Sequence, residues 1–472
     1  MKRNKDKYFI ILIILFELLF YLLEDQIKYN ITLVVIPLLI TITLLLLIYN
    51  NKHPDKNNYI YLILIYSIAL KNIYVLKTSI YDRSYDILEI YDNGHLAYIY
   101  NLYKKNILPL TNEWQFYHPP LFHIIAALGL KINELLGFSL NKGIEGIQYI
   151  NVVFSTLTIF TCYKIIDKIK IHNNFLIKLF MSVTPIYILF SGSINNDCLV
   201  TFLESLIILY LYKWDEMPTF KNTIILALIT GFCVMTKYNG AIMAAPILFV
   251  FVSKLVKYIK NKNSKDLVTF FLKMLVFGII SLPIGLWYYI RSIIKFGLVK
   301  VPVPNDWLYV GNASILERFF DISFSQIFDK IYCNINGIDT NMFAYLVKSS
   351  LFEEFKYKIP NIISILLLSI NIILIFISIF SILKYMFSKN KEKNLLLLFF
   401  VYIITIISYI IFNIKYPYFC SYDFRYIALT SFIGYCFISN YIELNKNKLI
   451  KYLVYFLTLI YSSLCVIFIL MI

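Results

Sequence analysis

Acidic side chains are concentrated in one short polar segment, residues 81–98, which lies between two long apolar stretches. Asp86, Glu89 and Asp92 are separated by three and six residues, so on a helix they would lie near one face. A carboxylate at the boundary between lipid and water can act as a general base on a hydroxyl group. The same spacing is typical of the solvated face of an amphipathic surface helix, and spacing alone favours this simpler interpretation.

Two basic residues stand at positions where the surrounding sequence carries little charge. Lys237 occupies a very short turn between two apolar stretches, and the sequence shows no obvious partner for it. A cation near membrane depth is a candidate for binding a phosphate, whereas a lysine that only reaches the lipid headgroups is the simpler alternative. Arg425 closely follows Asp423, so it can clamp a phosphate with its planar guanidinium group or form a local ion pair. The local pair is the simpler interpretation.

Two further polar motifs precede apolar stretches. Asn195, Asn196 and Asp197 stand in succession before one of them. One such residue is enough to cap a helix, so three in a row also point to the lining of a pocket. The motif His-Pro-Pro at 118–120 precedes another stretch, and its two prolines fix the backbone where a helix begins.

The elements that must position these residues are membrane helices. The chain has 472 residues, of which 60% are hydrophobic and 15% charged, and its mean hydropathy is +0.71. A soluble protein of this size needs more polar surface, whereas a bilayer requires apolar stretches with charge confined to the loops. The net charge of +16 does not indicate nucleic-acid binding, because the lysines mark one set of loops. The composition therefore predicts an all-α, polytopic protein embedded in a lipid bilayer.

The predicted membrane spans are the apolar stretches of about 20 residues, the length that crosses the hydrocarbon core of a bilayer. A further stretch, 119–137, is apolar but carries His123, Lys131, Asn133 and Glu134. The thirteen predicted spans are 8–23, 31–49, 59–77, 146–166, 175–190, 197–213, 222–236, 240–256, 267–290, 361–383, 395–412, 426–441 and 449–471.

The distribution of lysine decides whether residues 119–137 cross the membrane. If this stretch lies on the outer surface, the lysine-rich loops 254–265 and 389–393 face the cytoplasm, as positively charged loops prefer. If it spanned, both loops would face outward. We therefore predict a cytoplasmic N-terminus and a juxtamembrane helix at 119–137. The resulting organisation is one integral membrane domain, 1–472, with long outer loops at 78–145 and 291–360.

Taken together, these motifs resemble the GT-C superfamily of glycosyltransferases, which use polyprenyl-phosphate sugars. The likeness is greatest to glycosyltransferase family 39, which includes protein O-mannosyltransferases and the lipid A aminoarabinose transferase. It covers about residues 81–300 and recurs weakly at 415–430. Asn93 stands where many members carry a second acid, so a strict Asp-Glu pair is absent. The matching motifs are Asp92 with Tyr98 and Ile99, His118-Pro119-Pro120, Asp197, the segment 231–237, and Pro283, Trp287 and Arg291.

The resemblance implies an enzyme that moves a sugar from a polyprenyl-phosphate donor to an acceptor hydroxyl on the outer face, with inversion. Asp92 would deprotonate the acceptor, and Glu89, one helical turn away, is the other candidate base. No cofactor is expected, and Asn93 favours a site without a metal, although some GT-C branches bind a divalent ion. By the same resemblance, Lys237, Arg425 and Arg291 would bind the donor phosphate, and His95, His118, Asn196, Asp197 and Tyr238 would line the substrate pocket.

Two other classes of function are compatible with a polytopic chain. A transporter or lipid flippase of the cell envelope would place ionisable residues near the middle of the membrane. Glu17 and Glu204 are the only acids in the middle of the predicted spans, and the polar motifs gather on the outer face, which favours surface chemistry. A structural or assembly protein would need no reactive residues at all. We expect a multi-pass protein of a bacterial cell membrane, whose sugar and acceptor (protein, lipid or envelope glycan) stay open.

Overall fold

The computed structural model of the chain is helical throughout the parts that it describes. These parts are residues 2–28, 59–83, 86–171, 174–262, 264–297, 309–333, 340–388 and 392–472. Within them, the one backbone bridge outside the helices joins Tyr309 to Tyr418. The predicted span 31–49 lies outside the described residues. Each of the other predicted spans coincides with helical structure, because a long apolar segment can satisfy its backbone groups internally only as a helix.

The helices follow one another along the chain with short connections. The first half contains α1 (Lys2–Leu22), α2 (Glu24–Lys28), α4 (Tyr59–Lys77), α5 (His95–Tyr100), α6 (Leu121–Leu135), α7 (Leu140–Ile169), α8 (Asn174–Val183), α9 (Pro185–Leu189) and α10 (Asp197–Glu216). The second half contains α11 (Phe220–Thr236), α12 (Ala244–Lys260), α13 (Ser264–Phe296), α14 (Ile315–Phe320), α15 (Phe324–Phe328), α16 (Met342–Phe352), α17 (Asn361–Phe387), α18 (Lys393–Lys415), α19 (Leu429–Leu444) and α20 (Lys448–Met471). Short helical turns include η1 (Ile80–Asp82), η2 (Asn101–Lys105), η3 (Trp114–Tyr117), η4 (Phe190–Gly192), η5 (Tyr238–Met243), η7 (Phe419–Tyr422) and η8 (Phe424–Ile427).

Membrane-spanning capacity can be judged from the length and composition of these helices. Within the described residues, seven are long and apolar enough to cross a membrane, or nine if each of two bent pairs counts as one span. The helices α1 and α10 are not among them, since both carry several charged side chains, and α11 has only 17 residues. The polytopic architecture is therefore confirmed, whereas the number of thirteen spans stays a prediction.

The first long polar region contains a helix where one was expected. The stretch 119–137 forms α6, which begins directly after Pro120 and packs against α5 and α7. The acidic segment before it differs from the expectation, because no helix forms between Asp82 and His95. Asp86, Glu89 and Asp92 therefore do not share a helix face, and the predicted amphipathic surface helix is wrong at this position.

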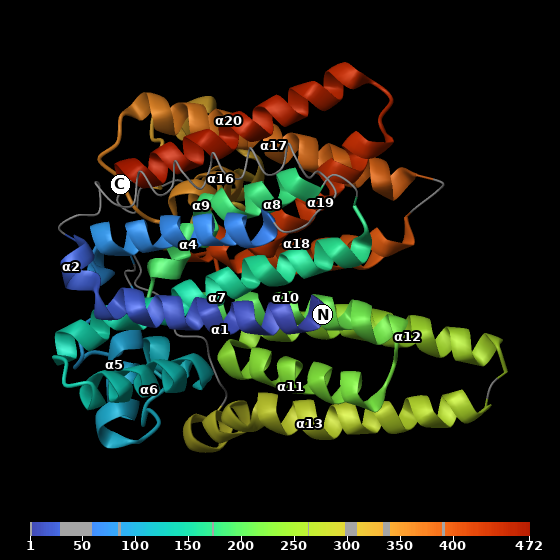
Figure 1. The fold of residues 1–472 in the computed structure, drawn as a ribbon, viewed down its shortest axis with the longest axis horizontal. Coiled ribbons are helices and arrows are strands. Elements are labelled where there is room, and N and C mark those ends of the chain that lie inside the picture. Colours follow the sequence, from blue (N-terminus) through green and yellow to red (C-terminus); the bar gives the residue numbers. More distant parts are fainter. Residues whose placement is uncertain are drawn as a thin grey trace.

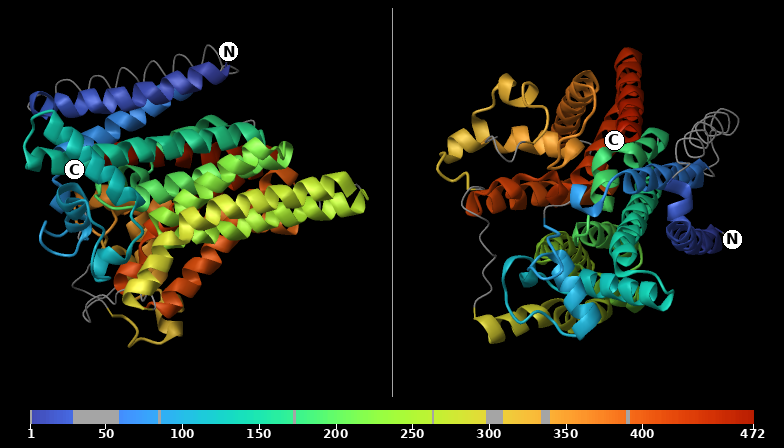
Figure 2. Two further views of the ribbon diagram at one scale, coloured as in Figure 1. Left: turned by 90° about the horizontal axis from the view of Figure 1, so that it is seen from below. Right: turned by 90° about the vertical axis from the view of Figure 1, so that its left-hand side faces the viewer.

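The long helices lie side by side, and their connections are gathered at two opposite ends of the molecule (Figure 1). The turn that joins α12 to α13 lies at one end, while α5 and α6 lie at the other, as a second view also shows (Figure 2). The lysines near this turn are thus separated from the acidic segment by the length of the helices. This arrangement agrees with the predicted sidedness, and its orientation in a membrane stays a prediction.

Two neighbouring helices set the position of the polar motifs. The helices α10 and α11 pack against each other and are joined by residues 217–219. Because the connection is short, the helices run in opposite directions, and the start of α10 lies beside the end of α11. Asp197 begins α10 and Lys237 directly follows α11, so the fold brings two distant motifs together.

Candidate active site

A buried ion pair joins the start of α10 to the end of α11. The ammonium nitrogen of Lys237 lies 2.5 Å from Oδ1 of Asp197, and the two residues are only 8% and 3% exposed. The sequence analysis found no partner for Lys237, and that inference is wrong. A buried lysine needs a counter-charge, and the aspartate that supplies it is 40 residues away on the neighbouring helix.

The asparagines before Asp197 hold this junction together. Asn195 accepts a hydrogen bond from the backbone N–H of Asp197 at 3.1 Å, while Asn196 donates to the carbonyl of Thr236, the last residue of α11, at 3.0 Å. Asn196 therefore links the two helices instead of capping its own. A Cβ atom at Gly240 would lie 2.7 Å from Sγ of Cys233, so only glycine permits the tight turn that follows Lys237.

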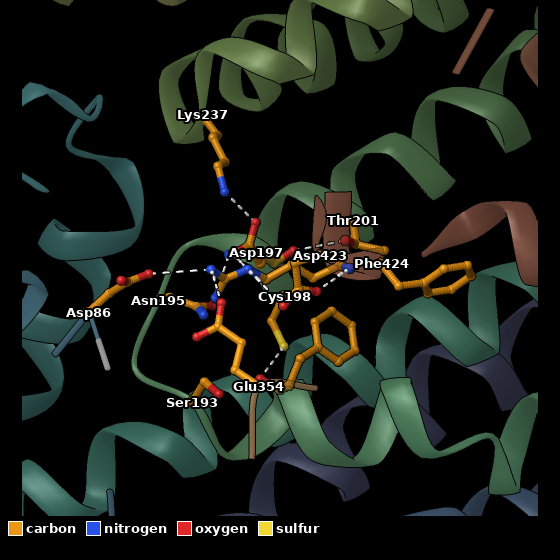
Figure 3. A network of polar contacts seen from close by, with 12 residues as sticks. Asp86, Ser193, Asn195, Asp197, Cys198, Thr201, Lys237, Glu354, Asp423 and Phe424 are labelled. Carbon is orange, nitrogen blue, oxygen red and sulfur yellow. Dashed lines mark hydrogen bonds and ion pairs between the residues drawn. The ribbon is translucent and has the colours of Figure 1, made fainter. Parts of the chain in front are cut away.

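Arg425, in the turn η8, contacts acids from four separate segments (Figure 3). Its Nη2 lies 3.4 Å from Oδ2 of Asp86 in the first outer segment and 3.4 Å from Oε1 of Glu354, which follows α16. Its Nε lies 3.8 Å from Oδ2 of Asp197 and 3.9 Å from Oδ2 of Asp423. The expected local pair with Asp423 is thus present but is only one of four contacts. We call these six residues the charged network: Asp86, Asp197, Lys237, Glu354, Asp423 and Arg425.

The backbone of the acidic segment determines which of its carboxylates reaches the charged network. The N–H of His95 donates to the carbonyl of Asp86 at 3.2 Å, so the chain folds back on itself before α5 begins. A Cβ atom at Gly94 would lie 2.4 Å from the carbonyl oxygen of Ile87, so this close approach requires glycine. As a result, Asp86 is half-buried beside Arg425.

The two acids expected to act as the base lie elsewhere. Asp92 and Glu89 are exposed. The carboxylate of Asp92 accepts a hydrogen bond from the backbone N–H of Glu89 at 3.1 Å, and that of Glu89 accepts one from Tyr81 at 3.4 Å. Neither carboxylate contacts Lys237 or Arg425, although their catalytic roles stay predictions.

Three histidines form a buried cluster in the first outer segment. Nδ1 of His95 lies 2.9 Å from Nε2 of His123, and the ring of His118 stacks on that of His95 with centroids 5.7 Å apart. Burial lowers the pKa of His95 to about 4 and that of His118 well below its usual value, so both are neutral at neutral pH. Two of the expected pocket residues, His95 and His118, are therefore packed together as uncharged rings.

Tyrosines connect this cluster to α13. The hydroxyl of Tyr98 lies 3.2 Å from that of Tyr288, which in turn donates to the carbonyl of Phe116 at 3.0 Å. Tyr238, an expected pocket residue, is partly buried, with its ring 6.4 Å from that of Tyr117. Its position directly after Lys237 places it between the charged network and the aromatic side chains of α13.

Arg291 is separate from the other two cations that were expected to bind phosphate. Its Nη2 donates to the carbonyl of Pro109 at 2.9 Å, and its guanidinium group lies 5.3 Å from the ring centroid of Tyr288. No acid of the described residues forms an ion pair with it. The fold thus brings Lys237 and Arg425 together but holds Arg291 against the first outer segment.

Two network residues were not selected as site residues from the sequence. Asp86 was considered only as part of the acidic segment, and Glu354 was not considered. Glu354 follows an apolar helix in the second long polar region, where Glu317 also lies, and nothing in the local sequence distinguishes the two acids. Only the contact with Arg425, 71 residues away, identifies it.

Metal binding is not supported by any cluster in the described part of the chain. No group of three or more His, Cys, Asp or Glu side chains within it is arranged to hold a metal ion. The carboxylates of the charged network surround a guanidinium group instead. The expectation of a site without a metal stays a prediction.

Comparison with known proteins identifies the domain that carries these residues. Residues 117–287 match the family model of dolichyl-phosphate-mannose-protein mannosyltransferases. No curated protein matches the chain. The matched part includes the junction of α10 and α11, with Asp197 and Lys237, and the end of α13. Residues 117–287 therefore form a domain of the dolichyl-phosphate-mannose-protein mannosyltransferase family, which confirms the predicted resemblance to GT-C enzymes and indicates a membrane glycosyltransferase of that type.

Proposed function

We propose that this protein transfers a sugar from a polyprenyl-phosphate carrier to an acceptor hydroxyl, with inversion, at the outer face of a bacterial cell membrane. The N-terminus lies in the cytoplasm, so the charged network faces outward. A lipid carrier reaches such a site from within the bilayer, with its phosphate at the interface. The acceptor is a protein, a lipid or an envelope glycan.

The observation that carries this proposal is the buried pair of cations at one end of the helix bundle. Lys237 and Arg425 come from different parts of the chain and are held together by Asp197, which contacts both. Two cations fixed at a helix end can stabilise the charge that develops on a leaving phosphate. The printed name of the matched family, which describes transfer from dolichyl-phosphate mannose to protein, supports the same donor chemistry.

Asp86 is the carboxylate best placed to act as the base. It lies on the rim of the charged network, half-buried, 3.4 Å from Arg425. In the reaction, a base accepts the proton of the acceptor hydroxyl while the acceptor oxygen bonds to C1 of the sugar and the bond from C1 to the phosphate oxygen breaks. Asp92 stays the alternative base.

Binding of the donor would also change the partners of Asp86. A phosphate placed between Lys237 and Arg425 competes with the carboxylates for the guanidinium group. Once Arg425 turns part of its hydrogen bonding to the phosphate, Asp86 is free to accept a proton. Donor binding would thus activate the base only when the sugar is in place.

Sugar transfer by the purified protein in nanodiscs tests the proposal. A panel of synthetic polyprenyl-phosphate sugars is supplied with hydroxyl acceptors, and product is measured by mass spectrometry. We expect transfer from at least one donor by the wild type and none after the double change Lys237→Gln with Arg425→Gln. Lys105→Gln, which removes an exposed cation of the same outer segment, is the matched control and should remain active. Equal transfer by the wild type and the double variant would overturn the proposal.

A further inference from the structure

The charged network contains more acids than bases. Asp86, Glu354, Asp197 and Asp423 all lie within 4 Å of Arg425, and Asp197 also pairs with Lys237. Four carboxylates and two cations give a net charge of −2 when all six groups are ionised. A buried site with this balance repels a phosphate, unless at least one carboxyl group carries a proton.

Geometry shows which carboxyl group a bound phosphate would meet. One nitrogen of Arg425, Nη2, is shared by Asp86 and Glu354, each at 3.4 Å. A phosphate that binds this nitrogen therefore comes into contact distance of Glu354. The side chain of Glu354 is 11% exposed and that of Asp86 is 25% exposed, so the glutamate forms the more enclosed side of the position.

Hydrogen bonding distinguishes Glu354 from the other enclosed acids. Asp197 accepts a hydrogen bond from Lys237, and Asp423 accepts one from the backbone N–H of Arg425 at 2.8 Å, and both contacts favour the ionised carboxylate. Burial raises the pKa of Asp423, but this backbone contact opposes the rise. Burial raises the pKa of Glu354 to about 8, with Arg425 opposing that rise. Glu354 is therefore the acid of the network that holds a proton at neutral pH.

We propose that Glu354 binds the carrier phosphate as a neutral carboxylic acid, donating a hydrogen bond to a phosphate oxygen held by Arg425. This inference rests on the proposed function and adds a residue from the second outer segment to the phosphate site. The protonated acid contributes a donor without adding negative charge beside the ligand. The hydroxyl of the carboxyl group thus complements the two cations.

Other ionisable groups act on Glu354 from every side. Arg425 and Asp423 face it from the turns before α19, Asp86 from the first outer segment and Asp197 from α10. Tyr345 of α16, Cys420 of η7 and its own neighbour Glu353 also lie within electrostatic reach. Apart from Arg425, none of these groups carries positive charge, so ionising Glu354 in the presence of a phosphate is unfavourable.

Binding of a polyprenyl methyl phosphodiester tests this inference without any sugar transfer. This probe carries one negative charge from about pH 6 to about pH 9.5 and has no group to transfer. For the wild type in nanodiscs, we expect affinity to be constant below about pH 8 and to fall by up to about tenfold per pH unit above it. Glu354→Gln keeps a hydrogen-bond donor that does not titrate, so its affinity should stay nearly constant up to about pH 9.5.

Glu353→Gln is the matched control, because it makes the same change one residue away. Glu353 forms no ion pair with Arg425 within 4 Å, and its electrostatic neighbours include Tyr74 and Tyr357. This variant should keep the wild-type fall in affinity. Constant affinity of the wild type across the range, or an unchanged fall in Glu354→Gln, would overturn the role of Glu354. Failure to bind the probe at any pH would overturn the phosphate site itself, together with the proposed function.

Discussion

Charged side chains are buried in two regions of this protein, and their partners differ. In the charged network at one end of the bundle, Lys237 and Arg425 are each paired with acids from distant segments. Between α1, α4 and α7 lies a second group, which we call the interior set: Glu17, Lys71, Asn72 and Thr156. There Asn72 donates to Glu17 at 3.2 Å and Lys71 donates to Thr156 at 3.2 Å, so each charge has a neutral partner.

The difference indicates which region performs chemistry. The interior set connects three neighbouring helices through single hydrogen bonds, which is an arrangement suited to helix packing. The charged network joins a turn, two outer segments and a helix start, and its Asp86 is open to solvent on one side. A transporter would depend on the interior set, because ionisable residues in its pathway lie within the membrane. A transferase would depend on the charged network, and the two interpretations therefore predict opposite responses to mutation.

The largest effect is expected from the carboxylate that acts as the base. We expect Asp86→Asn to lower the rate of sugar transfer by about 10²–10⁴-fold, since an amide cannot accept the proton of the hydroxyl group. Asp92→Asn makes the same change on an exposed carboxylate and should retain at least about half of the rate. Turnover by each variant, measured in nanodiscs with the same donor, compares them directly. Loss of activity in Asp92→Asn alone would assign the role to Asp92.

The next largest effect is expected at Lys237. Lys237→Gln should lower the transfer rate by about 10²–10³-fold, because one of two cations that stabilise the leaving phosphate is lost. The change also leaves Asp197 with only Arg425 as a charged partner, which can reduce stability. Lys237→Gln combined with Asp197→Asn restores the charge balance and controls for this effect. If the double variant is stable and fully active, Lys237 has only a structural role.

The sequence predicted the helices well and the ion pairs poorly, for a physical reason. Apolar length and lysine distribution are local properties, and they located the helices and the juxtamembrane segment α6. An ion pair between helices depends on which ends meet, and the partners of Arg425 in the first outer segment lie 339 residues away. Lys237 and Arg425 were identified because a cation is rare beside an apolar stretch. Glu354 was missed because an acid in a polar loop is ordinary.

The acidic segment shows how a local pattern can mislead. Spacings of three and six residues favour a helix face, but Gly94 allows the chain to pass close to Ile87 and to form a turn instead. The contact that decides the structure is between backbone atoms, to which side-chain spacing is insensitive. Asp86 and Asp92 consequently lie in different environments.

A smaller effect is expected at Arg291, a cation outside the charged network. Arg291→Gln removes the hydrogen bond to the carbonyl of Pro109 and the contact with Tyr288. Loss of such a hydrogen bond corresponds to about 1 kcal/mol, or roughly a fivefold decrease in transfer rate. The Michaelis constant for the donor, measured alongside, should change little. A rise in that constant as large as the one caused by Lys237→Gln would instead place Arg291 in the phosphate site.

The smallest effect on transfer is expected from the interior set, and this result bears most directly on the comparison. Replacing Glu17 by Gln and Lys71 by Met removes both charges while keeping similar side-chain volumes. Because neutral residues of matched size usually substitute well for buried charges, we expect the free energy of unfolding to change by less than about 2 kcal/mol. Sugar transfer should stay within about twofold of the wild type, because neither residue contacts the charged network. Thermal unfolding and turnover of the double variant in nanodiscs provide the two measurements. A stable double variant that has lost its activity would show that the interior charges participate in function, as a transport pathway requires.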